Sequence, residues 1–278
     1  MTPSPAASDA ALVGRLVGRP VGAPVRVPVA APPRVAAWLA AADDGPVEVL
    51  HACRDVVHVD VGGRAVGVCS ATAPGLPHAV RTNLAALSSG DVPTAYVYCG
   101  SLHLGGRVLV TGRLVGVRAP RIDTGRVPKT SPVSVQGTPR SRGAGLVATV
   151  PALIEMPACV TPGTVGRLVG RGDGLTPLGD DVLGGWLLAH RAAGRSTPEV
   201  DDAVRRALPD TTTLSATLLE CALVGECPDL VAGYLRALGT AAGGSAREAL
   251  CALGHSSGTG LAYGIDLALD VLADRAAA

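Results

Sequence analysis

The chain has 278 residues, enough for one large or two modest domains with a hydrophobic core. Hydrophobic residues make up 47% of it but aromatic residues only 2%, so the core has to be built from Val, Leu and Ala. The formal net charge of +1 provides no field to attract nucleic acid or an anionic membrane, and no uncharged apolar run is long enough to span a bilayer.

The seven cysteines are scattered and form no C-x-x-C pair, and residues 1–9 have neither the basic nor the apolar region of a signal peptide. We therefore expect reduced thiols in a cytoplasmic protein. Cys221 and Cys227 could serve as metal ligands. Cys221 shares a predicted helix with Leu218 and Ala222, however, which favours a role as a small core residue.

The first half of the chain is predicted to be β-rich. Prolines between Pro20 and Pro33 keep its start extended, because each fixes its own φ and restricts the preceding residue. The pairs Gly62-Gly63 and Gly105-Gly106 each predict a tight hairpin turn. The expected elements are a helix over 34–42 and strands over 47–52, 56–61, 64–70, 96–104 and 107–117.

Residues 121–145 are rich in Pro, Ser, Thr, Gly and Arg and show little apolar periodicity, which predicts a flexible linker or loop. Six basic residues gather in and near this segment against one acid, Asp123; they are Arg118, Arg121, Arg126, Lys129, Arg140 and Arg142. The segment lacks an aromatic side chain on which a base could stack, so a solvated loop is favoured over a nucleic-acid site.

The second half is predicted to be helical. Pro, Thr or Ser stands near several helix starts, and Gly follows several ends. Apolar residues recur at helical spacing, as in Leu261, Ile265, Leu269 and Leu272. The expected helices cover 177–193, 198–208, 212–224, 228–238, 245–253 and 261–273.

These patterns together predict an α+β fold. A β-rich domain of hairpin or small-barrel type is expected over 1–120. The flexible linker or loop over 121–145 follows it, and a helical domain is expected over 146–278.

The first candidate binding loop runs into the helix expected from 177, and residues 170–181 read Gly-Arg-Gly-Asp-Gly-Leu-Thr-Pro-Leu-Gly-Asp-Asp. Glycines permit backbone angles that other residues avoid, and the unpaired N–H groups of a helix start can bind an anion. The candidate ligand-binding residues in this loop are Arg171, Gly172, Gly174 and Thr176.

Asp180 and Asp181 oppose an anion at this helix start unless they have another task. They could act as catalytic groups, hold a cation such as Mg²⁺, pair with an arginine, or stabilise the helix dipole. A ligand loop and a well-capped turn explain the residues equally well at this point.

The second candidate loop, 253–260, stands before the last expected helix and reads Leu-Gly-His-Ser-Ser-Gly-Thr-Gly. Its glycines and hydroxyl side chains have the composition of an anion-binding nest, but it lacks the Lys and the spacing of a Walker A loop. His255 is a candidate acid or base, although a lone His is more often a capping or packing residue. The candidate ligand-binding residues are Gly254, Ser256, Ser257, Gly258 and Thr259.

These segments resemble the motifs of the AllH-like family. Residues 172–181 are similar to its signature G-x-G-L-T-P-x-G-D-D, and residues 213–215 and 254–258 are similar to its second and third motifs. The chain departs from the signature at Asp173, where many relatives have Pro, and at Leu178, where a small residue is common. The motifs cover the C-terminal half.

The resemblance implies a subunit of oxamate carbamoyltransferase, which interconverts oxamate plus carbamoyl phosphate and oxalurate plus phosphate in allantoin catabolism. It also implies FdrA-like and AllG-like partner subunits and small anionic substrates. Such a transfer needs two anions held in line more than it needs covalent help from the protein. The alternative is a non-catalytic assembly subunit, in which the glycine loops are helix junctions and the acids are dipole caps.

Overall fold

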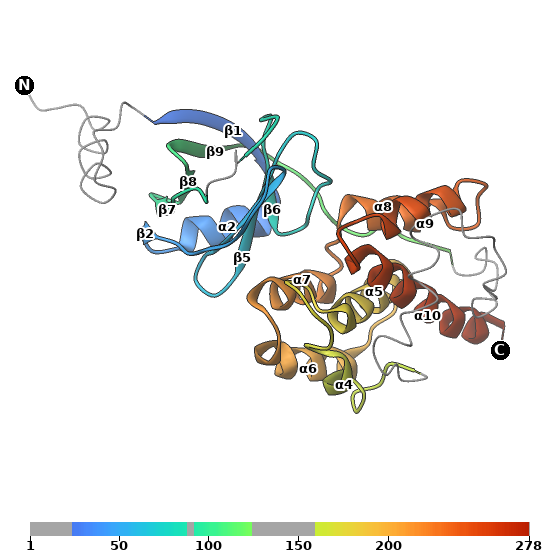
Figure 1. Ribbon diagram of the computed structural model, residues 1–278. Helices are drawn as coiled ribbons and strands as arrows, with labels where there is room; N and C mark the ends of the chain where they lie inside the picture. Colours follow the sequence, from blue (N-terminus) through green and yellow to red (C-terminus); the bar gives the residue numbers. More distant parts are fainter. Residues whose placement is uncertain (1–23, 88–91, 124–158, 278) are drawn as a thin grey trace, which may run out of the picture. The chain divides into compact units, whose positions relative to one another are not determined.

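The computed structural model describes residues 24–87, 92–123 and 159–277. The chain divides into two compact units, one of Met1–Ala73 with Ala79–Val115 and one of Pro74–His78 with Gly116–Ala278 (Figure 1). The first is a curled mixed sheet and the second is helical, which confirms the predicted α+β class. The loop predicted over 121–145 lies outside the described residues from position 124 onward.

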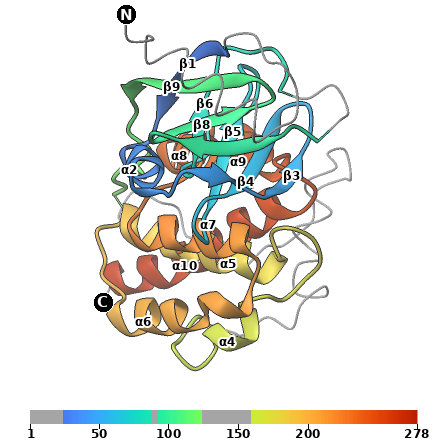
Figure 2. The same cartoon turned by 90° about the vertical axis from the view of Figure 1, so that its left-hand side faces the viewer.

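The sheet of the first unit curls into a half-barrel around helix α2 (Pro33–Ala41), as two directions of view show (Figure 1, Figure 2). Val35 and Leu39 of α2 share one apolar core with Val57 and Leu102 of the sheet. Among the described residues the strand order is β2-β7-β8-β9-β1-β6-β5-β4-β3. The strands are β1 (Val25–Ala31), β2 (Gly45–Pro46), β3 (Val49–Ala52), β4 (Val56–Asp60), β5 (Ala65–Cys69), β6 (Ala79–Arg81), β7 (Ala95–Tyr98), β8 (Ser101–Leu104) and β9 (Arg107–Leu114).

Both predicted glycine hairpins are confirmed. Gly62 and Gly63 have φ of 61° and 79° between the antiparallel strands β4 and β5. Gly105 and Gly106 have φ of 53° and 79° between β8 and β9. Positive φ at both central residues gives a turn whose twist matches that of the flanking strands.

One prediction in the sheet was wrong in detail. The single strand expected over 96–104 is two strands, because Cys99 and Gly100 turn the chain back with φ of 46° and 70°. Asp44 accepts a hydrogen bond of 2.7 Å from the N–H of Cys99 and supports this unusual turn. The extended conformation predicted for the proline-rich start is confirmed over Val25–Ala31, where β1 pairs with β9 along its whole length.

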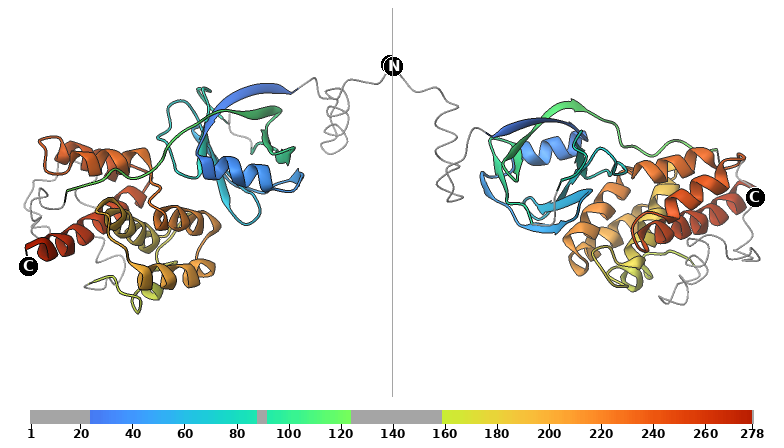
Figure 3. Two further views of the ribbon diagram at one scale, coloured as in Figure 1. Left: turned by 180° about the vertical axis from the view of Figure 1, so that it is seen from behind. Right: turned by 45° about the horizontal axis from the view of Figure 1, so that its top comes forward.

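The second unit is built on the long helices α5 (Leu178–Ala192) and α10 (Ser257–Ala277), which lie side by side (Figure 3). Helix α7 packs on α5, and α9 packs on α8 and α10. The remaining helices are α4 (Val165–Leu168), α6 (Pro198–Ala207), α7 (Thr213–Leu223), α8 (Asp229–Ala237) and α9 (Gly243–Cys251), with a 3₁₀ turn η2 (Leu208–Asp210) after α6. Within the described residues, no helix is long and apolar enough to cross a bilayer.

Glycines allow α5 and α10 to touch backbone to backbone. A Cβ at Gly185 would overlap the carbonyl oxygen of Leu261, and a Cβ at Gly264 would overlap that of Val182. A Cβ at Gly260 would stand 2.7 Å from the Cβ of Asp181. Larger residues at these positions would force the two helices apart, so the glycines here are required by packing and not by backbone conformation.

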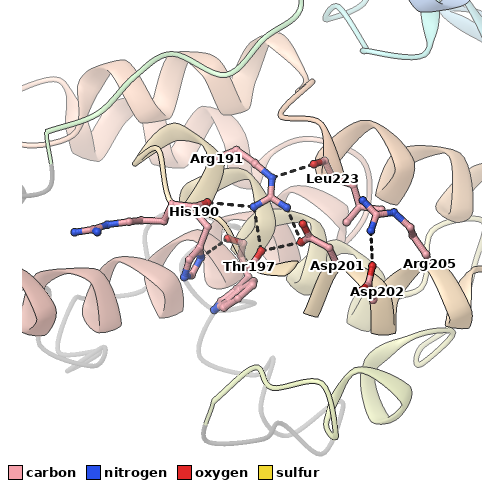
Figure 4. Close-up of polar contacts among 9 residues, drawn as sticks. His190, Arg191, Thr197, Asp201, Asp202, Arg205 and Leu223 are labelled. Carbon is pink, nitrogen blue, oxygen red and sulfur yellow. Dashed lines mark hydrogen bonds and ion pairs between the residues drawn. The ribbon is translucent and has the colours of Figure 1, made fainter. Parts of the chain in front are cut away.

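The other end of α5 is fixed by a polar network around Arg191 (Figure 4). The guanidinium donates to the carbonyl oxygens of Leu223 and Arg195, to the Thr197 hydroxyl at 3.0 Å, and to Asp201 at 2.5 Å. The side chains of Arg191 and Asp201 are only 16% and 13% exposed. This network joins the C-terminal end of α5 to the start of α6 and to the end of α7. It therefore supports the fold at the end of α5 that is away from the candidate loops.

Alanine at Gly185 should destabilise the helical unit strongly, because the added methyl group meets the Leu261 carbonyl with no room to relax. We expect a loss of about 3 kcal/mol or more in the free energy of unfolding. The matched control is Gly233→Ala on α8, where a Cβ meets nothing within 4 Å; it should be neutral or stabilising by up to about 1 kcal/mol. Urea unfolding followed by circular dichroism measures both, and equal effects would contradict the packing argument.

Alanine at Arg191 should remove about 3 kcal/mol of stability, since it leaves the nearly buried Asp201 carboxylate without its cation. Arg205→Ala is the control, because Arg205 and Asp202 form an i,i+3 pair with side chains 55% and 63% exposed. That variant should lose less than about 1 kcal/mol. A similar loss in both variants, measured by the same unfolding assay, would show that the Arg191 network is unimportant.

Candidate functional site

The N-terminal ends of α5, α7 and α10 come together in the helical unit. The hydroxyls of Thr176, just before α5, and Ser257, at the start of α10, lie 2.6 Å apart. Thr212 caps α7 by accepting from the Ser215 N–H, and its hydroxyl donates to the Leu175 carbonyl oxygen at 2.6 Å. The two candidate loops near 176 and 257 therefore meet in the fold.

The loop before α5 has the backbone that its glycines predicted. Gly170, Gly172 and Gly174 have φ of 71°, 113° and 94°. A Cβ at Gly172 would also stand 2.8 Å from the Leu178 nitrogen. Residues 171–175 are exposed, so the side chain of Arg171 is available to a ligand.

The first N–H groups of α5 are largely engaged by the protein itself. Gly179 donates to the Arg171 carbonyl oxygen at 2.8 Å, and both Asp180 and Asp181 donate to the Pro177 carbonyl oxygen. These amides therefore close the turn. The hydroxyls and the side chains of the loop remain as the groups that a ligand could meet.

Asp180 joins the loop before α5 to the start of α7. It is 3% exposed, and its carboxyl oxygens accept from the Gly170 N–H at 2.9 Å and from the Thr211 hydroxyl. Burial raises the pKa of this carboxyl, while hydrogen bonds from Thr211, Gly170 and Ser215 act in the opposite direction. With its oxygens occupied by donors, Asp180 fixes the loop before α5 to the start of α7.

Asp181 has different surroundings. It is 6% exposed, and its Oδ2 atom is buried without a hydrogen-bond partner among the described residues. Burial raises the pKa of this carboxyl well above its ordinary value; hydrogen bonds from Ser257 and Thr176 oppose the rise, and the charge of Asp180 adds to it. A buried acid of this kind favours its neutral form.

The segment before α10 differs from the predicted loop. Helix α10 begins at Ser257 and not at Leu261, so residues 257–260 form its first turn. Gly258 donates to the Leu253 carbonyl oxygen at 3.0 Å, and a Cβ there would overlap the Leu250 carbonyl. Gly258 and Gly260, two of the glycines that suggested an anion nest, therefore serve helix packing.

The other candidates in this segment lie at different depths. Gly254 and His255 are exposed, Ser256 and Ser257 are half-buried, and Thr259 is buried. Ser257 is the member of the segment whose hydroxyl meets the loop before α5. His255 is solvent-facing, and no described contact joins it to the two aspartates.

The donor set at the helix tips does not fit a metal ion. Among the described residues, no group of three or more His, Cys, Asp or Glu side chains is arranged to hold one. Both carboxyl oxygens of Asp180 already accept a hydrogen bond from the protein. The seven cysteines, all within the described residues, form no disulfide, and Cys221 and Cys227 are buried as core residues.

Sequence reasoning missed the part played by Thr211 and Thr212. Thr212 caps α7, and its hydroxyl also donates to the Leu175 carbonyl oxygen in the loop before α5, while the Thr211 hydroxyl donates to Asp180 in the first turn of α5. Three adjacent threonines are more than one cap requires. That surplus is the signal that could have drawn attention to them.

The comparisons with known proteins bear on this same part of the chain. Residues 168–269 match the family model of AllH, described as oxamate carbamoyltransferase subunit AllH. The AllH match begins at the end of α4, runs into α10 and contains all three helix tips. The sheet unit lies outside the AllH match. Neither the curated proteins nor the solved structures gave a match.

The raised pKa of Asp181 predicts a characteristic pH dependence of stability. An acid whose pKa is raised by folding stabilises the folded state fully below its unfolded pKa, and this contribution is lost as the pH rises through the folded pKa. Asn at position 181 stays neutral, so Asp181→Asn should become progressively more stable than the wild type as the pH rises above about 4.

Chemical unfolding at several pH values measures this difference. Asp173→Asn is the matched control, because Asp173 is exposed on the same loop, and its stability should follow that of the wild type. An Asp181→Asn curve parallel to the wild-type curve at every pH would show that Asp181 ionises normally in the folded chain.

Proposed function

We propose that this chain is a subunit of an oxamate carbamoyltransferase-type complex and that the joined helix tips bind its small anionic substrates. The supporting observation is that two of the motif segments within the AllH match are joined by the Thr176–Ser257 hydrogen bond, and that Thr212, next to the third, donates to the Leu175 carbonyl oxygen. The reaction would be oxalurate plus phosphate to carbamoyl phosphate plus oxamate, within allantoin catabolism. FdrA-like and AllG-like chains would be the partner subunits.

The reaction requires that the two substrates be positioned and that the charge developing on their oxygens be stabilised. A phosphate oxygen forms a bond to the ureido carbon of oxalurate, the bond from that carbon to the oxamate nitrogen breaks, and the nitrogen takes up a proton. No electron is transferred to or from a cofactor. A site that holds two anions in line and donates hydrogen bonds to their oxygens supplies most of what this step needs.

Several side chains at the tips fit that requirement. The half-buried hydroxyls of Thr176 and Ser257 can donate to an oxyanion, and the exposed Arg171 can form a bidentate contact with a carboxylate or phosphate. The exposed His255, two residues before Ser257, is placed to exchange protons with solvent or substrate. Asp180 holds the loop before α5 in a fixed position against the start of α7.

A non-catalytic assembly subunit is the second candidate, and one observation favours it. The N–H groups of Gly179, Asp180, Asp181 and Gly258 all donate to carbonyl oxygens of the protein, as they would at simple helix junctions. In that case the hydroxyl pair would only join α5 to α10, and substrate would bind to a partner chain.

Turnover by the reconstituted complex separates the two candidates. Ser257→Ala and Thr176→Val should each lower the rate of carbamoyl phosphate formation by about 10- to 100-fold, the effect of losing a hydrogen bond to a charged group. The control is Ser245→Ala, which removes an exposed hydroxyl bonded to the Ala242 carbonyl oxygen and should leave the rate unchanged. Normal turnover in both site variants would favour the assembly subunit.

A further inference from the structure

The neighbouring carboxyls of Asp180 and Asp181 have different hydrogen-bond surroundings. Asp180 accepts from a backbone N–H and a hydroxyl, and such donors stabilise a negative charge. Asp181 has an oxygen that is buried without a partner, next to the charge of Asp180. Burial and the charge of Asp180 both act against ionisation of Asp181, so its carboxyl favours the neutral form.

The packing around Asp181 prevents water from reaching it. Gly260 of α10 presses against it so closely that even a methyl group there would stand 2.7 Å from the Asp181 Cβ and 2.9 Å from a Leu178 methyl. Gly260 and Leu178 therefore pack closely around the base of the Asp181 side chain. Its polar neighbours are the hydroxyls of Thr176 and Ser257.

Few other titratable groups stand near Asp181 among the described residues. Asp180 precedes it on α5, Arg171 and Asp173 lie on the loop before α5, and His255 precedes α10. The last three are exposed, so solvent screens their charges. The first turn of α10 itself contributes only hydroxyls and glycines.

The hydroxyl pair can point its hydrogen bonds in either of two directions. A hydroxyl that accepts one hydrogen bond can donate another. In the 2.6 Å contact between Thr176 and Ser257, the direction of the hydrogen bond at one hydroxyl therefore sets its direction at the other. If Asp181 donates into the pair, the last hydroxyl has its proton free for an external acceptor. If Asp181 is ionised and accepts, the last hydroxyl presents lone pairs outward.

We propose that Asp181 is a positioning residue that stays a neutral acid and thereby directs the Thr176–Ser257 hydroxyl pair to donate to an oxyanion, either a carboxylate or a phosphate. This rests on the proposed function, in which the tips bind small anions. Ionisation of Asp181 reverses the direction of the hydrogen bonds in the hydroxyl pair and releases the anion. Anion affinity therefore depends on the protonation of one buried carboxyl.

The test is calorimetric titration of the full chain with oxamate and, in a separate arm, with inorganic phosphate, from acidic to alkaline pH. For oxamate, the wild-type Kd should rise about tenfold per pH unit once Asp181 ionises, the slope of a one-proton linkage. Asp181→Asn should remove this slope, because its amide donates at every pH. Asp180→Asn should keep the slope, with its midpoint moved to lower pH.

Carbon NMR of the Asp181 carboxyl in the full chain gives a second readout that requires no ligand. A neutral carboxyl at neutral pH, together with the affinity slope in one of the two arms, supports the proposal and shows which anion the pair prefers. An ionised carboxyl, or an equal slope in Asp181→Asn, overturns it. Turnover by the reconstituted complex without pH-dependent anion binding by this chain also overturns it, while the proposed function stands.

Discussion

The candidate site depends on the contact between α5 and α10 at backbone distance. Three glycines, Gly185, Gly260 and Gly264, let carbonyl oxygens and Cα atoms of the two helices meet. Helices this close leave no room for one to slide past the other, because protein interiors are packed as densely as crystals. The N-terminal ends of the helices are thereby held together, and the hydroxyls of Thr176 and Ser257 come within hydrogen-bond distance.

This packing also explains why the site is mostly hydroxyl and carboxyl. The N–H groups at both helix starts turn inward to carbonyl oxygens of the protein, and Asp180 joins α7 to the loop before α5. One buried acid, Asp181, remains beside the hydroxyl pair with an unpartnered oxygen. The reactive character of the site would come from that acid and the pair it touches.

Much of the fold could be predicted from local sequence. The paired glycines fixed both hairpins, because positive φ at two adjacent positions suits few other residues. Capping threonines and prolines placed most helices to within a residue or two. The turn at Cys99-Gly100 escaped prediction because it depends on Asp44, far away in the chain.

The candidate site was predictable in its location and less so in its roles. Glycine-rich sequence before a helix suggests a ligand loop, yet Gly258 and Gly260 are needed where another helix approaches, and no local pattern distinguishes these uses. The separate roles of Asp180 and Asp181 could not be predicted either. The role of Asp180 depends on its contact with Thr211 and that of Asp181 on its contact with Gly260, and both contacts form only in the folded chain.

The most direct test is a double-mutant cycle on Thr176→Val and Ser257→Ala, measured by urea unfolding of the full chain. The account predicts a coupling free energy of about 1 kcal/mol between the two hydroxyls, the usual value for a side-chain hydrogen bond. Strictly additive effects, with no coupling, would contradict the claim that the helix tips are joined.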